Sequence, residues 1–80
     1  MSNFPEYHQA LDASGLACPM PLLKTRLALK SMAPGLILWV TATDPGSWRD
    51  IRKYVDMTSN ELLHAAEVGD SYQFWIKKGA

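Results

Sequence analysis

The sequence has only one cysteine, Cys18, in 80 residues. A single cysteine cannot form an intramolecular disulfide, whereas a small secreted domain usually carries several cysteine pairs. The chain also lacks any apolar run of about 18 residues, as a transmembrane helix requires, and its first residues lack the basic and apolar segments of a signal peptide. We therefore expect an unprocessed, cytoplasmic protein that does not associate with a membrane.

An excess of charge of one sign is absent as well. Eight Lys and Arg residues balance eight Asp and Glu residues, so the formal net charge is +0 at pH 7. Binding to a phosphate backbone depends on a surplus of basic side chains, so we expect no direct nucleic-acid binding. The two histidines, His8 and His64, stand at no metal-ligand spacing from Cys18 or from each other, and we expect neither a metal nor a cofactor.

The sequence does have the composition of a globular domain, with 48% hydrophobic, 20% charged and 10% aromatic residues. Its length predicts a single domain over residues 1–80, with residues 1–7 as a disordered lead-in because they contain a proline and no periodic pattern. A domain of this size buries roughly two thirds of the surface of its unfolded chain. We expect a shallow site at the edge of an element rather than a deep enclosed pocket.

A stripe of core-type residues at helical spacing predicts a first helix that starts at Pro19 or Pro21 and ends near Ala33. The stripe consists of Leu22, Thr25, Leu29 and Met32. Pro34 and Gly35 follow it, and such residues end helices.

The rest of the chain predicts four strands and a second helix. The strands are expected over residues 8–12, 36–42, 61–68 and 71–77, and the helix over residues 45–57. Asp44 is the predicted N-cap of that helix, and Gly69-Asp70 forms a hairpin turn between the last two strands. The order β-α-β-α-β-β predicts an α+β fold, a two-layer α/β sandwich in which a four-stranded mixed sheet carries both helices on one face.

Cys18 lies just before the first predicted helix. The positive end of the helix dipole and its unpaired amides favour an anion there, so we expect a lowered pKa for the Cys18 thiol. Pro19 and Pro21 lack an amide hydrogen and disfavour a helical backbone at the residue before them, which holds the thiol outside the helix. If the helix starts at Pro19, Met20 supplies the only amide hydrogen among the next three residues. If it starts at Pro21, Cys18 lies two residues beyond the cap.

Cys18 has two interpretations from its residue type. A free cysteine is most often a small buried hydrophobic residue. A cysteine bracketed by Gly15, by two prolines and by the start of a helix has a weaker case for burial, and this setting favours a functional thiol. We therefore predict Cys18 as the reactive residue, with Gly15, Pro19, Met20, Pro21 and Asp44 as its supporting residues.

A Cys-Pro-x-Pro motif, Cys18-Pro19-Met20-Pro21, stands at the start of the first predicted helix. Further matching segments are Leu11-Asp12, Gly15-Leu16, Pro21-Leu22-Leu23-Lys24, Thr43-Asp44-Pro45 and Asp50-Ile51. In the motif, in these segments, and in its length and element order, the sequence resembles the TusA/SirA-like family of sulfur carriers. The resemblance covers about residues 8–78.

The resemblance implies that Cys18 accepts a sulfane sulfur, carries it as a persulfide and relays it to an acceptor protein. It implies a sulfurtransferase-like carrier rather than a stand-alone enzyme. Its partners would be a cysteine desulfurase or another persulfide donor, and a sulfur-acceptor protein. The acceptor pathways known in the family are tRNA thiolation, molybdenum-cofactor maturation and sulfur oxidation, and all stay open. Met20 occupies the variable motif position, where members that thiolate tRNA often carry an acidic residue, and this departure disfavours that branch.

Four other residues are candidates for partner binding. Lys24 and Arg26 on the first predicted helix can attract an acidic partner or simply form a solvated face. Trp39 and Trp75 are expected on the sheet face away from the helices, because successive strand residues alternate between faces. There they form an exposed apolar patch or are covered by neighbouring side chains. Trp48 is predicted to lie in the core.

A function from another class fits the same residues. The chain can be a non-catalytic regulatory or adaptor module that binds a protein partner through the sheet face or the basic first helix, with Cys18 as a redox-sensitive thiol. Replacing Cys18 with serine separates the two functions, because sulfur acceptance needs the thiol and partner binding does not. For either function we expect a monomer or a weak dimer.

Overall fold

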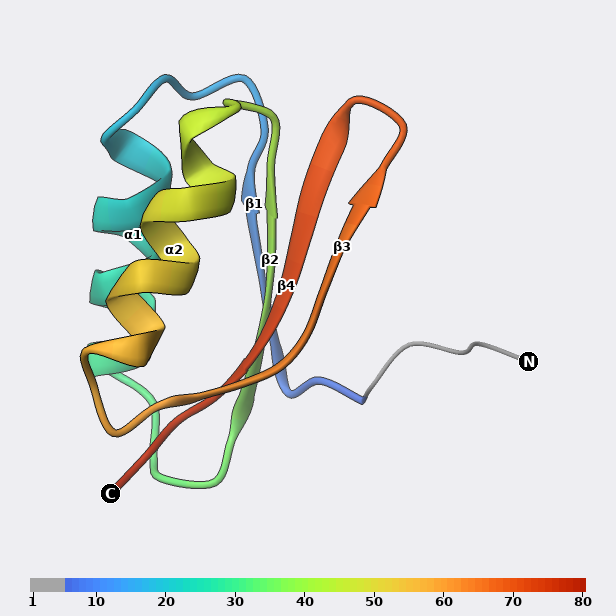
Figure 1. The fold of residues 1–80 in the computed structure, drawn as a ribbon. Helices are drawn as coiled ribbons and strands as arrows, with labels where there is room; N and C mark the ends of the chain where they lie inside the picture. Colours follow the sequence, from blue (N-terminus) through green and yellow to red (C-terminus); the bar gives the residue numbers. More distant parts are fainter. Residues whose placement is uncertain (1–5) are drawn as a thin grey trace.

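The computed structural model describes residues 6–80, which form two helices and four strands in the predicted order (Figure 1). The elements are β1 (Gln9–Ala13), α1 (Met20–Lys30), β2 (Ile37–Ala42), α2 (Gly46–Asp56), β3 (Glu61–Val68) and β4 (Ser71–Lys77). Of the lead-in predicted at residues 1–7, residues 1–5 lie outside the described residues. The ring of Tyr7 lies with its centroid 5.0 Å from that of Trp39.

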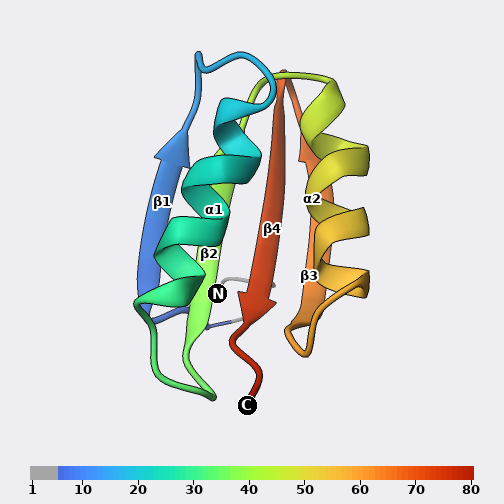
Figure 2. The same ribbon diagram turned by 90° about the vertical axis from the view of Figure 1, so that its left-hand side faces the viewer.

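The four strands form one mixed sheet in the order β1-β2-β4-β3. β1 pairs in parallel with β2, while β4 pairs antiparallel with both β2 and β3. Adjacent parallel strands need a crossover connection, and α1 supplies it between β1 and β2. Both helices cover the same face of the sheet, as Figures 1 and 2 show. The predicted two-layer α+β sandwich is therefore confirmed.

The first helix ends earlier than predicted. α1 ends at Lys30 rather than near Ala33, because the amides of Ser31 and Met32 bond to the carbonyls three residues earlier, at 3.2 and 3.1 Å. These bonds close the helix in a tighter last turn, and Pro34 disfavours a helical backbone at the residue before it. Neither helix of the described chain has the length and apolar run that crossing a membrane requires.

The hydrophobic core lies between the sheet and the two helices. Its buried members are Leu29, Met32, Leu38, Val40, Ile51, Val55, Phe74 and Ile76. Thr25 is also buried, and its hydroxyl donates a hydrogen bond of 2.8 Å to the Pro21 carbonyl within α1. The stripe predicted for the first helix and the alternation predicted for the strands therefore both point into this layer.

The sheet face opposite the helices carries a row of aromatic rings. Trp39 and Trp75 are cross-strand partners on β2 and β4, and their rings stack with centroids 5.9 Å apart and planes 8° from parallel. Tyr7 lies against Trp39, and His64 lies 5.2 Å from Trp75. Trp75 is consequently only 1% exposed. Both tryptophans lie on the predicted face, but Trp75 is covered by its neighbours and offers no apolar surface to a partner.

Trp48 lies at the margin of the core rather than inside it. Its ring centroid is 5.9 Å from the centroids of both Tyr72 and Phe74, and the Arg52 guanidinium lies 4.9 Å from the indole centroid. The residue is partly buried because it lies in the first turn of α2, where the helix layer begins.

Candidate functional site

The loops that follow β1 and β2 meet at one end of the sheet. The two strands are parallel and Ala13 is paired with Ala42, so the loops that follow them leave the sheet at the same end, as Figure 1 shows. The Gly15 amide donates a hydrogen bond of 2.8 Å to Thr43 Oγ1, which joins the two loops. The topology therefore brings the segment before α1 next to the segment before α2.

The first loop turns sharply after β1. The Leu16 amide donates a hydrogen bond of 3.3 Å to the Ala13 carbonyl, and Gly15 between them has a φ of 79°, a conformation that favours glycine. The Ser14 amide donates a hydrogen bond of 3.0 Å to Asp12 Oδ1. Hydrogen bonding by the Ser14 side chain and backbone lowers the pKa of the Asp12 carboxyl. Gly15 thus lies where the backbone of this loop requires it.

Cys18 is exposed and lies two residues before the first residue of α1. The helix begins at Met20, between the two starts that the sequence allowed. Pro19 precedes the helix, Pro21 occupies its second position, and no side chain caps its first turn. The Cys18–Pro19 peptide bond is cis. The thiol is therefore outside the helix and accessible, in agreement with the prediction.

The Cys18 thiol contacts α2 through a carboxylate. Its Sγ donates a hydrogen bond of 3.2 Å to Oδ2 of Asp50, which is 32 positions later in the chain. The Asp50 side chain is 24% exposed, and its Oδ1 lies 3.7 Å from Nε of Arg49. Because the Arg49 side chain is 85% exposed, solvent weakens that ion pair. The proton of the thiol therefore lies in a hydrogen bond to the Asp50 carboxylate.

This environment raises the pKa of the Cys18 thiol, so the predicted lowering is wrong. The hydrogen bond to Asp50 is the largest cause, because it stabilises the protonated thiol. Desolvation and the negative charges of Asp50 and Asp44 act in the same direction, and the positive charge of Arg49 opposes them. A carboxylate in contact with the sulfur therefore outweighs the end of the helix.

The start of α1 also offers few donors to a thiolate. Pro19 and Pro21 have no amide hydrogen, and the Met20 amide donates its hydrogen bond to the Ala17 carbonyl at 2.9 Å. Anions bound at helix starts are usually held by such amides together with the dipole. The predicted lowering of the pKa assumed that the Met20 amide was free to bind the thiolate, but this amide is already bonded to the Ala17 carbonyl.

The first turn of α2 packs closely against Cys18. Oδ2 of Asp44 accepts a hydrogen bond of 2.9 Å from the Gly46 amide, and the Asp44 carbonyl accepts one of 3.0 Å from the Ser47 amide. Asp44 therefore accepts hydrogen bonds from the first amides of α2, as predicted, but the helix begins one residue later than predicted, so Pro45 and not Asp44 occupies the N-cap position. A Cβ on Gly46 would lie 3.0 Å from Asp44 Oδ2 and 3.8 Å from the Cys18 Cβ. Glycine at this position lets both side chains approach the same turn.

Asp50 and Thr43 are not among the residues that the sequence predicted for the site. Both fall in segments that carry the family resemblance, yet nothing in the residue pattern places them near Cys18. The one local signal is that Asp50 follows Gly46 by four positions, so the two share a face of the second helix. The contact with Cys18 itself depends on how α2 packs beside α1.

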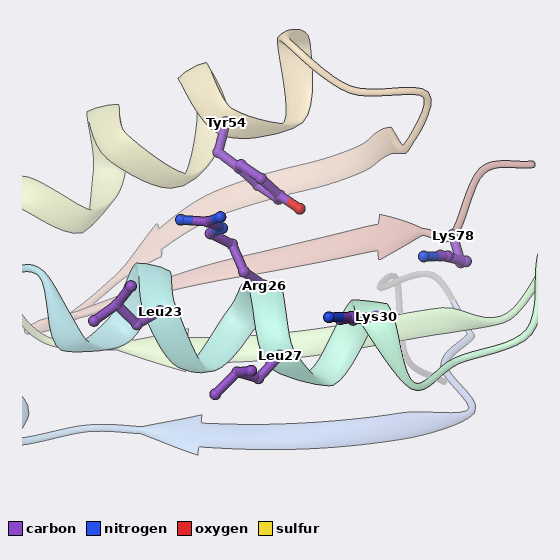
Figure 3. A pocket seen from close by; sticks show the side chains of 6 residues that line it. All are labelled: Leu23, Arg26, Leu27, Lys30, Tyr54 and Lys78. Carbon is purple, nitrogen blue, oxygen red and sulfur yellow. The ribbon is translucent and has the colours of Figure 1, made fainter.

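An open hollow of about 480 Å³ lies between α1 and α2 (Figure 3). Its lining consists of Leu23, Arg26, Leu27, Lys30, Tyr54 and Lys78. The Arg26 guanidinium lies 5.7 Å from the centroid of the Tyr54 ring. Lys24 lies elsewhere on the helix, because residues two positions apart are about 200° apart around its axis. The two basic residues predicted to bind a partner thus belong to different surfaces.

The site offers one accessible thiol with two carboxylates beside it. Among residues 6–80, no three His, Cys, Asp or Glu side chains gather in an arrangement that could hold a metal ion. The exposed thiol can attack or exchange sulfur through its thiolate.

Comparison with known proteins places this chain in a family. The family model described as "Sulfurtransferase TusA" matches residues 9–78. A "Sulfur carrier protein TusA" of Allochromatium vinosum is 45% identical over 73 residues, which cover 91% of this chain and 96% of the relative. A protein of the same description from Pseudomonas putida is 41% identical over 70 residues, which cover 88% of each chain.

A solved structure has the same fold. The SirA-like protein of Desulfitobacterium hafniense superimposes with a TM-score of 0.77 and covers 91% of this chain and 100% of its own. Its sequence identity is 19%, so this likeness shows the fold alone. The family model and the curated relatives span nearly the whole chain, including the Cys-Pro-x-Pro segment and the carboxylates that meet at Cys18. The chain belongs to the TusA family.

Proposed function

We propose that this protein is a sulfur carrier that takes up a sulfane sulfur as a persulfide on Cys18 and passes it to an acceptor protein. The observation that carries the proposal is the exposed thiol of Cys18, the single cysteine of the chain, in the Cys-Pro-x-Pro motif of a TusA-family protein. The relatives named as sulfur carriers, which match over nearly their whole length, support the same role. A surface thiol can meet the reactive sulfur of another protein directly, so this transfer needs no enclosed pocket.

Loading exchanges one sulfur–sulfur bond for another. The Cys18 thiolate attacks the outer sulfur of a donor persulfide, a bond forms between Sγ and that sulfur, and the donor's own bond to it breaks. The donor leaves as a thiolate and takes up the proton that Cys18 lost, so no oxidant or reductant is consumed. Unloading repeats the exchange, with Cys18 as the leaving thiolate. Because the chain has no second cysteine, no internal thiol can discharge the persulfide as a disulfide.

Two protein partners belong to this proposal, a cysteine desulfurase or another persulfide donor and a sulfur-acceptor protein. Both must reach Cys18 at the end of the sheet where α1 begins. Arg26 supports docking along α1, because it lies next to Leu23 and Leu27, which are 39% and 68% exposed. The single cysteine supports a reducing compartment, and we place the carrier in the cytoplasm.

Lys24 and Trp39 are weaker candidates for partner binding. Lys24 is exposed on another side of α1, and a charged residue on a solvated helix face needs no partner to explain its presence. Trp39 is partly buried on the open sheet face, and its indole nitrogen donates a hydrogen bond of 2.9 Å to Gln73 Oε1. We therefore assign partner docking first to the Arg26 side of α1.

Intact-protein mass spectrometry tests the proposal. Reduced protein incubated with a cysteine desulfurase and free cysteine is expected to gain the mass of one sulfur atom, which a reductant removes. Cys18→Ser removes the acceptor atom with little change of shape, so the variant should gain no sulfur. Its circular dichroism spectrum and Tm should match those of the wild type, because the side chain is exposed. Alkylating Cys18 before the incubation is a second control and should also prevent the gain.

Two results would overturn the proposal. One is no mass gain with several desulfurases although Cys18 is readily alkylated. That outcome would favour the adaptor module, whose partner binding would survive Cys18→Ser. The other is a mass gain that persists in Cys18→Ser, because the sulfur would then be held by another group.

A further inference from the structure

The hydrogen bond between Cys18 and Asp50 depends on the hydrogen of the unloaded thiol. Sγ of Cys18 donates the hydrogen of its S–H group to Oδ2 of Asp50 at 3.2 Å. When a second sulfur is attached, Sγ carries no hydrogen and this hydrogen bond is lost. A persulfide is more acidic than a thiol, so its outer sulfur is anionic at neutral pH. Loading therefore replaces a hydrogen-bond donor with an anion beside Asp50.

Two carboxylates lie near Cys18, that of Asp50 within α2 and that of Asp44 just before the helix. A Cβ on Gly46 would lie 3.0 Å from Asp44 Oδ2, 3.8 Å from Asp50 Oδ2 and 3.8 Å from the Cys18 Cβ, so these groups surround one point. Both carboxylates disfavour negative charge on Cys18, and Arg49 favours it. The Arg49 side chain is 85% exposed and is screened by solvent. The net field at the sulfur is therefore unfavourable to an anion.

We propose that Asp50 is a positioning residue that stabilises the unloaded thiol and destabilises the loaded persulfide, and so shifts the sulfur-transfer equilibrium toward release. This inference rests on the proposed function of Cys18. Asp50 itself forms no bond to the transferred sulfur. It acts through the hydrogen bond that the thiol can donate and the persulfide anion cannot.

The exchange of sulfur with a small persulfide donor shows in which direction Asp50 is expected to shift the equilibrium. In RSS⁻ + Cys18-SH → Cys18-SS⁻ + RSH, one sulfur–sulfur bond forms, one breaks, and the proton of Cys18 moves to the released thiol. Asp50 stabilises the left side through its hydrogen bond and destabilises the right side through its charge. At equilibrium, a carrier with aspartate at position 50 therefore has a smaller loaded fraction than one with a neutral residue there.

The equilibrium itself can be measured. Wild-type protein and Asp50→Asn are equilibrated with a fixed ratio of cysteine persulfide to cysteine, and the loaded fraction is read by intact mass spectrometry. The asparagine amide keeps the shape of the side chain, removes its charge and can donate to a sulfur anion. We expect the ratio of loaded to unloaded protein to rise about two- to fivefold in Asp50→Asn, the range of an exposed charge interaction. Asp50→Glu restores the charge and should return the ratio toward that of the wild type.

The pH profile of alkylation gives a second readout, which a purely structural role of Asp50 would not move in a defined direction. Because Asp50 raises the pKa of the Cys18 thiol, Asp50→Asn should shift the profile with iodoacetamide to lower pH and speed alkylation at neutral pH. Asp44→Asn keeps an acceptor for the Gly46 amide and should produce a smaller shift of the same sign. Asp56→Asn, exposed at the other end of α2, is the matched control and should change neither readout.

The outcomes separate this inference from the proposed function. If the wild type is loaded and Asp50→Asn is loaded to the same or a smaller extent, the inference is overturned and the carrier function stands. If neither protein is loaded, the carrier function fails and the inference fails with it. Should Asp50→Asn not fold, as judged by circular dichroism, Asp50→Ser decides, because it also removes the carboxylate from the sulfur. An unchanged loaded fraction and alkylation profile in that variant would then overturn the inference.

Discussion

At the scale of the residue, the chemistry of Cys18 is determined by two segments that are distant in the chain. The motif places the thiol beside the start of a helix, whose end carries a partial charge of about half a proton charge. The fold places a full carboxylate charge 3.2 Å from the same sulfur. Because the nearer and larger charge dominates, the thiol is a weaker acid than its motif suggests. The reactivity of Cys18 therefore depends on the carboxylate of Asp50 as well as on the two prolines of the motif.

Gly15→Ala tests the loop that leads to Cys18. Gly15 has a φ of 79°, which costs a residue with a side chain about 1 kcal/mol. A Cβ at this position would meet nothing within 4 Å, so backbone strain is the only expected penalty. We expect Gly15→Ala to lower the free energy of unfolding by about 1 kcal/mol in urea denaturation.

Gly15→Asn is the matched control, because asparagine tolerates a positive φ better than alanine does. It should lose less stability than Gly15→Ala. Unchanged or increased stability of Gly15→Ala would show that this turn does not require a left-handed backbone.

At the scale of the element, α2 connects the core to the site. Its buried face consists of Ser47, Ile51 and Val55. Asp50 immediately precedes Ile51. One turn of the helix therefore places the Ile51 side chain in the core and the Asp50 side chain against the thiol of Cys18. Any change that tilts or frays this helix should therefore alter both the stability of the protein and the environment of the sulfur.

Ile51→Ala measures the contribution of α2 to the core. Ile51 is 0% exposed, and removing such a side chain leaves a cavity that costs about 2–5 kcal/mol in the free energy of unfolding. A domain of this length has about 4–12 kcal/mol in total, so the loss should be large in urea denaturation. Lys53→Ala, on the exposed side of the same helix, is the control and should change stability by less than about 0.5 kcal/mol.

The same variant also tests the link between core and site. If Ile51→Ala still folds, the alkylation rate of Cys18 at neutral pH should change together with its stability, because Asp50 lies in the same turn. A loss of stability with an unchanged alkylation profile would show that the position of Asp50 does not depend on core packing.

At the scale of the whole molecule, the two faces of the sheet are covered in different ways. Two helices cover one face. The other face has no third layer in the described part of the chain, and its own rings cover it instead: Tyr7 and Trp39 on one side and His64 beside Trp75 on the other. This stacking removes Trp75 from solvent, and the proposed site at Cys18 lies at the end of the sheet where α1 begins, away from these rings.

We expect the protein to be monomeric at micromolar concentration. With Trp75 buried and Trp39 partly buried, the described residues of the open face do not form the large contiguous apolar patch that stable self-association requires. Size-exclusion chromatography with light scattering should give the mass of one chain across the concentration range. A mass that rises with concentration would contradict this prediction. Trp39→Ala exposes Trp75 and should promote self-association.

The sequence by itself determined the order and type of the elements and the position of Cys18 just before the first helix. These features follow from local rules, since helical stripes such as that of Leu29 and Met32 repeat within one helix and Pro34 acts on its direct neighbour. For the same reason the ends of elements were predicted less well than their centres. The end of α1 depended on a three-residue hydrogen-bonding pattern that has no marker in the sequence.

Only the tertiary structure decided the environment of Cys18 and the burial of Trp75. Asp50 reaches the thiol across 32 positions because parallel pairing of β1 and β2 sends both following loops to one edge of the sheet. Trp75 is buried because the antiparallel register of β2 and β4 sets Trp39 directly against it. Hydrogen bonds, charges and ring contacts act over a few ångströms in space, whatever the separation in the chain. The local pattern of the sequence therefore names Cys18 and its motif, but neither Asp50 nor the contacts that determine how the thiol reacts.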